Sequence, residues 1–86
     1  MLVDTHCHLD AVEFDTDRAA IADAAMRAGV ELIVVPGVER VNFGAVASVC
    51  REHAGCRAAY GIHPMYVERA RESDLDALRE TIRREH

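Results

Sequence analysis

The stretch LIVVP, residues 32–36, is an apolar, strand-like run near the middle of this 86-residue chain. Similar runs lie at residues 2–5 and 57–62, so the three runs begin about 25 to 30 residues apart. A helical pattern follows each of them. Strands that alternate with helices of this length predict a parallel sheet with right-handed crossovers. The carboxyl ends of all three strands should therefore share one edge of the sheet.

Polar residues and glycines mark the predicted ends of the helices. We expect the first helix to begin at an Asp15 cap and to stop at Gly29. The second should begin at an Asn42 cap and stop at Gly55, and the third carries an S-x-x-D capping signature at residues 73–76. Each helix shows an apolar stripe, formed by Ile21, Ala22, Ala25, Met26 and Ala28, by Phe43, Val46, Ala47, Cys50 and Ala54, and by Leu75, Leu78 and Ile82.

The repeat length indicates the architecture. Eight βα units of about 28 residues give roughly 230 residues, close to the size of a (β/α)₈ barrel. The predicted fold class is therefore α/β, with three βα units of a TIM-barrel-type fold that form an incomplete barrel. Residues 1–86 should make one domain, and a three-stranded sheet should leave open edges through which the chain could associate with itself.

Composition excludes several classes of protein. No stretch approaches the roughly 20 apolar residues of a membrane span, so no membrane partner is expected. The start lacks a secretory signal, and three unevenly spaced cysteines fit reduced thiols, so we expect a cytoplasmic protein. The formal net charge of −5 argues against a broad basic surface for nucleic acid. A phosphate-ester substrate would therefore need positive charge from a bound metal ion.

The clearest chemical motif is DTHCHLD, residues 4–10. Residues two apart on a strand face the same side, so His6 and His8 can converge on one cation while Cys7 points the other way. Asp4 shares the histidine face and could orient a ligating imidazole. The alternative is a pair of histidines that only form hydrogen bonds. The carboxylate and the opening position in the repeat favour the metal site.

A second motif, YGIHP, residues 60–64, ends the third strand. Pro64 biases His63 toward an extended conformation, and the shared edge of the sheet should place His63 near His6 and His8. His63 could bind a substrate phosphate, act as acid or base, or be structural. A Cys-x2-His-x2-Cys string at residues 50–56 is a weaker zinc candidate, because its first cysteine lies in the apolar helix stripe.

With these residues in place, the chain resembles the TatD family of metal-dependent hydrolases, within the amidohydrolase-like TIM barrels. The matching stretches are VDTHCHLD, RAGVELIVVPGV and AAYGIHPMYVE, and they cover essentially the whole chain in order. Phosphoesterases of the PHP type also open with Asp-x-His-x-His but lack Gly-x-His-Pro at this position. The resemblance implies the N-terminal part of a divalent-metal phosphodiesterase, commonly a deoxyribonuclease in this family, acting on DNA or another phosphodiester.

The resemblance also implies roles for individual residues. His6 and His8 match metal ligands for a divalent ion (Mg²⁺, Zn²⁺ or Mn²⁺), Asp4 supports them, and His63 matches the histidine near the substrate phosphate. The family's later ligands, a glutamate in Gly-Glu-x-Gly-Leu-Asp, two histidines and an aspartate, are absent from these 86 residues. We therefore assign no catalytic residue within the chain and expect it to be inactive alone. The alternatives are a non-catalytic interaction module that associates through an open sheet edge, and a small metal-binding protein.

Overall fold

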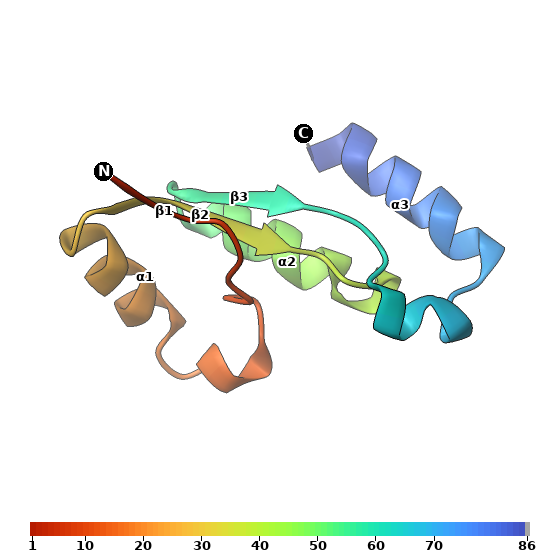
Figure 1. The fold of residues 1–86 in the computed structure, drawn as a ribbon, viewed down its shortest axis with the longest axis horizontal. Coiled ribbons are helices and arrows are strands. Elements are labelled where there is room, and N and C mark those ends of the chain that lie inside the picture. The colour runs from red at the N-terminus through yellow and green to blue at the C-terminus, as the bar shows by residue number, and fades with distance from the viewer. Residues whose placement is uncertain (86) are drawn as a thin grey trace.

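Three parallel strands form one sheet in the computed structural model, which describes residues 1–85 (Figure 1). The strands are β1 (Leu2–Asp4), β2 (Val30–Pro36) and β3 (Cys56–Ala59), and they lie side by side in chain order. Val3 stands opposite Leu32 on one side of β2, and Val35 stands opposite Ala58 on the other. The predicted parallel sheet is thus confirmed, and the carboxyl ends of its strands share one edge.

A helix follows each strand, as the repeat predicts. The helices are α1 (Arg18–Arg27), α2 (Arg40–Glu52) and α3 (Glu72–Glu85), with short 3₁₀ helices at Val12–Phe14 and Pro64–Arg69. α1 contacts β2, α2 contacts β2 and β3, and α3 packs against α2 (Figure 1). No helix in the part of the chain that the structure describes is long and apolar enough to cross a membrane.

The core lies between one face of the sheet and the first two helices. Ile33 and Val35 alternate along β2 and are almost fully buried, whereas Leu32 and Val34 on the opposite face remain partly exposed. The buried cluster consists of Leu9, Ala22, Ile33, Val35, Val46, Val49 and Cys56. The helices therefore cover one face of the sheet and leave the other face less covered.

The ends of α1 differ in part from the prediction. The helix begins at Arg18 after Asp17, and Asp15 instead ends the preceding 3₁₀ helix, where its N–H donates to the carbonyl of Val12. The predicted cap at Asp15 is therefore wrong, because the loop makes an extra turn before the helix begins. Gly29 does end this unit in the left-handed region, at a φ of 101°, as predicted.

The ends of α2 correct two further expectations. The helix begins one turn earlier than predicted, and Glu39 is its cap, while Asn42 is its third residue and completes a capping box with Glu39. The helix stops at Glu52. Gly55 does not end it in the left-handed region, because the φ of Gly55 is not positive. A Cβ at Gly55 would lie 3.0 Å from the sulfur of Met26, so close packing explains this glycine.

The third helix is capped by a different carboxylate and packs more loosely than expected. Asp74, not Asp76, accepts the backbone N–H of Arg71 at the helix start. Leu75 and Ile82 are about half exposed, and the one buried residue of α3 within the described chain is Thr81. The predicted apolar stripe exists in the sequence but has little packed against it in residues 1–85.

Candidate metal centre

His6 and His8 follow β1 on the sheet face that the helices leave less covered. The N–H of Cys7 between them donates to the carbonyl of Val34 at 3.0 Å, which continues the pairing of β1 with β2. Cys7 packs against the buried core, so strand alternation turns both histidines the other way. Burial and the nearby Asp4 carboxylate raise the pKa of the Cys7 thiol, which stays neutral.

The two imidazoles converge. Their Nε2 atoms lie 3.1 Å apart, and the rings meet edge to face with centroids 4.8 Å apart. A tetrahedral ion with Zn–N bonds near 2.0–2.1 Å needs two nitrogens roughly 3.3 Å apart. Both side chains are exposed, so a cation can reach them without disturbing the core. The separation and exposure of the His6 and His8 nitrogens fit two ligands of one ion, and the same separation fits the alternative of a hydrogen bond between the two rings.

Asp4 has a different partner from the one expected. Its carboxylate accepts the backbone N–H of His6 at 3.1 Å, two residues along the chain. This contact fixes the backbone where the strand ends and the histidines begin, so Asp4 supports His6 through the main chain.

Arg18, at the start of α1, holds the loop that carries the histidines. Its guanidinium donates to the carbonyl of Leu9 at 2.6 Å and to that of Ala11 at 2.8 Å, and it contacts the Asp10 carbonyl at 3.3 Å. It also pairs with the carboxylate of Asp15 at 2.7 Å. Leu9 is 1% exposed and therefore anchors the loop in the core. Sequence reasoning missed Arg18, because nothing in the pattern separates it from the other arginines.

His63 has the extended backbone that its position before proline predicts, with φ −66° and ψ 142°. Its Nδ1 accepts the backbone N–H of Met65 at 3.0 Å. In the neutral ring this contact places the proton on Nε2. His63 therefore presents a hydrogen-bond donor, and its side chain is exposed.

His8 and His63 line one groove of about 340 Å³ at the shared edge of the sheet. The structure thus places His63 on the same groove as His8, which contacts His6. The other lining residues are Asp10, Ala11, Glu13, Val38, Asn42, Met65 and Tyr66. Asp10 has one carboxylate oxygen, Oδ1, that is buried without a hydrogen-bond partner.

The ligand set within residues 1–85 stops at two histidines. No group of three His, Cys, Asp or Glu side chains in this part of the chain is arranged to hold a metal ion, which also removes the weak zinc candidate at residues 50–56. Catalytic zinc sites usually have three protein ligands and an open position. Within residues 1–85, His6 and His8 are therefore one ligand short of such a site.

Comparison with known proteins finds relatives of this chain. The family model described as "TatD related DNase" matches residues 3–86. The uncharacterized metal-dependent hydrolase YjjV of Escherichia coli K12 is 35% identical over 82 residues, which are 95% of this chain and 32% of YjjV. The uncharacterized metal-dependent hydrolase YabD of Bacillus subtilis 168 is 36% identical over 80 residues, 93% of this chain and 31% of YabD. The chain thus spans about a third of the length of these relatives.

A solved structure gives the same result in three dimensions. The crystal structure of YjjV, described as a TatD homolog from E. coli K12, matches 96% of this chain with a TM-score of 0.87 and 35% identity. The match covers 32% of the YjjV chain. The predicted fold class is therefore confirmed: three βα units of a TIM-barrel-type α/β fold that cover part of a barrel.

Proposed function

Because this chain belongs to the TatD related DNase family, we propose that it forms the first part of a divalent-metal-dependent hydrolase that cleaves phosphodiester bonds, with DNA as the favoured substrate. The observation that carries the proposal is the convergence of the His6 and His8 Nε2 atoms to 3.1 Å, beside a groove that His8 shares with His63. The names of two relatives, both metal-dependent hydrolases, support the reaction class.

The residues of this chain have distinct tasks in the proposed site. His6 and His8 would hold the ion through their Nε2 atoms, and Asp4 and Arg18 would keep the supporting backbone in place. When bound, a divalent ion supplies charge to a phosphate oxygen and lowers the pKa of an attacking water. His63 would donate its Nε2 proton in a hydrogen bond to a phosphate oxygen, with its ring oriented by the Met65 amide.

The ion suits the electrostatics of this chain. Ten arginines are outnumbered by fifteen acidic residues, and Asp10 and Glu13 line the groove itself. A phosphodiester would be repelled by these carboxylates unless a cation lay between them and the substrate. Mg²⁺, Zn²⁺ and Mn²⁺ all remain candidates for that cation.

The test compares two variants of the native-length protein, by which we mean this chain within a protein of the length of its relatives. His6→Ala combined with His8→Ala should abolish stoichiometric metal binding, measured by elemental analysis. It should also lower kcat/KM on bis(p-nitrophenyl) phosphate and on a DNA oligonucleotide on the order of a hundredfold or more, since metal catalysis contributes several kcal/mol. His53→Ala, at the far end of α2, is the control and should change neither quantity. Unchanged metal content and rates in the double variant would overturn the proposal.

The isolated 86-residue chain favours a second role, association with itself. β1 and β3 each have one edge that no strand of residues 1–85 covers. A largely apolar groove of about 440 Å³ lies beside β3, where the buried hydroxyl of Tyr60 has no hydrogen-bond partner. We propose that the isolated chain, with two ligands, is inactive and associates with itself through such an edge. Light scattering would show oligomers; an active monomer would contradict this.

A further inference from the structure

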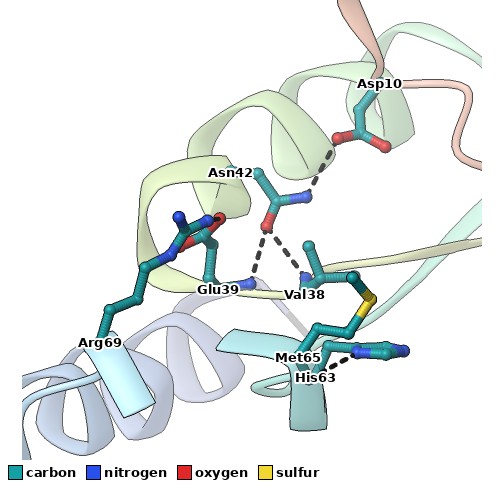
Figure 2. A network of polar contacts seen from close by, with 7 residues as sticks. All are labelled: Asp10, Val38, Glu39, Asn42, His63, Met65 and Arg69. Atoms are coloured by element: carbon teal, nitrogen blue, oxygen red, sulfur yellow. Dashed lines mark hydrogen bonds and ion pairs between the residues drawn. The ribbon is translucent and has the colours of Figure 1, made fainter. Parts of the chain in front are cut away.

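A polar network joins the three loops that follow the strands, and Asn42 lies at its centre (Figure 2). The Nδ2 of Asn42 donates to the Oδ2 of Asp10, in the loop after β1, at 3.1 Å. Its Oδ1 accepts the backbone N–H groups of Val38 at 3.0 Å and of Glu39 at 3.2 Å, both in the loop after β2. The Asn42 side chain therefore donates to the loop after β1 and accepts from the loop after β2.

The network continues from Val38 into the third loop. The Val38 carbonyl accepts the backbone N–H of His63 at 2.7 Å, and the His63 ring in turn accepts the N–H of Met65. Hydrogen bonds thus link Asp10, two residues after His8, to the backbone N–H of His63, and a separate hydrogen bond from Met65 orients the His63 imidazole. His8 and His63 face the same groove, so this network spans the distance between them.

The contact between Asp10 and Asn42 depends on the amide. Within residues 1–85, the Asn42 amide is the one hydrogen-bond donor to the Asp10 side chain, whose other oxygen is buried without a partner. A carboxylate at position 42 could still accept the N–H groups of Val38 and Glu39. It would place an oxygen against the Asp10 carboxylate, however, and like charges at this distance repel.

A second set of contacts fixes the far side of the same loop. Arg69 donates two hydrogen bonds to the Glu39 carboxylate, at 2.6 and 3.1 Å (Figure 2). Its guanidinium also lies 4.4 Å from the centre of the Tyr66 ring. The loop after β2 is therefore held by Asn42 from within and by Arg69 from the third loop. Asn42 is the member of this set that reaches the loop carrying His8.

We propose that Asn42 is a positioning residue that fixes the separation of His8 and His63 across the groove. The proposal deepens the proposed function, because the metal and phosphate roles of these two histidines rest on it. Within residues 1–85, the Asn42 side chain forms no hydrogen bond with either histidine. It acts through the backbone of Val38 and through Asp10, so its loss would change the relative placement of two groups that must act on one substrate.

The test uses the native-length protein and a readout that needs no substrate, the hydrogen exchange rate of the His63 amide measured by NMR. Asn42→Asp should raise this rate roughly tenfold or more, because repulsion at Asp10 loosens the loop that accepts the His63 N–H. The double variant Asp10→Asn with Asn42→Asp exchanges donor and acceptor. The amide introduced at position 10 can donate to the carboxylate introduced at position 42, so the rate should return to within about threefold of the original.

The control is Asp76→Ala, which removes an exposed carboxylate that pairs with Arg79 within α3 and should leave the His63 rate unchanged. The proposal is overturned if Asn42→Asp leaves the His63 amide as protected as before, if the double variant is no better than the single one, or if the control has the same effect.

Hydrolysis is scored separately from exchange. Where the native-length protein cleaves phosphodiesters, Asn42→Asp should lower kcat roughly tenfold or more, and the double variant should recover it. If the protein cleaves none, the proposed function fails while the exchange rates still decide the role of Asn42.

Discussion

Replacing Arg18 by methionine should lower the free energy of unfolding by about 2–3 kcal/mol and loosen the loop that carries His8. The Arg18 guanidinium makes two short hydrogen bonds to loop carbonyls, at 2.6 and 2.8 Å, and its side chain is 19% exposed. Hydrogen bonds to charged groups contribute roughly 1.5–3 kcal/mol each, so these two would contribute up to about 6 kcal/mol. Water reaching the freed carbonyls of this surface loop recovers part of that energy.

Urea denaturation followed by circular dichroism of the native-length protein measures this loss. Arg18→Lys should lie between the original and the methionine variant, because an ammonium is a point charge and cannot span several carbonyls. The matched control is Arg79→Met, whose arginine pairs with exposed Asp76 one turn away and should contribute about 0.5 kcal/mol or less. A loss for Arg18→Met no larger than that of the control would refute the role assigned to Arg18.

Three further predictions concern stability and reactivity. Gly29→Ala should lower the free energy of unfolding by about 1–2 kcal/mol in urea denaturation, because Gly29 has a φ of 101°. Gly44→Ala should raise it by about 0.5–1 kcal/mol, because Gly44 lies in mid-helix and an added Cβ would have nothing within 4 Å. A change of the same sign in both variants would contradict these predictions. Burial raises the pKa of Cys50 from 9.0 to about 11. At pH 8 the folded thiol should therefore be alkylated roughly a hundredfold more slowly than the unfolded thiol, which mass spectrometry would measure. The free energy of unfolding should also fall as the pH rises above 9, because the unfolded thiol loses its proton first. A divalent ion at a hundred times its Kd should add about 2.7 kcal/mol to the free energy of unfolding, and His6→Ala with His8→Ala should remove this gain.

Local patterns were enough to predict the order of elements and the shared edge of the sheet. The apolar stripe of α2 is confirmed for Phe43, Val46 and Ala47, which are buried, and Gly29 stops its unit as expected. These features depend on residues close together in the chain, so periodicity and backbone preference decide them. The proximity of His6 and His8, which are separated by one residue, is likewise a local feature.

Contacts between distant segments were harder to predict. Asn42 was expected as a helix cap, yet its amide also reaches Asp10, 32 residues earlier. Arg18 carries no signal in the sequence, because its role depends on carbonyls that only the folded loop brings together. The helix starts at Asp15 and at residues 73–76 were misplaced for a related reason: several nearby polar residues can cap a helix, and packing selects among them.

The order of the strands has a consequence for synthesis on the ribosome. β1, β2 and β3 neighbour one another in the order in which they are translated, and each crossover helix packs on strands of its own or the adjoining unit. Nearly every pairing therefore closes a short loop, so contacts can form as each unit leaves the exit tunnel. Within residues 1–85, β1 and β3 each keep one unpaired edge, and β1 is the strand that leads to the histidine pair. An unpaired strand edge exposes a nascent chain to aggregation or to chaperones, and at β1 that edge lies close to His6 and His8.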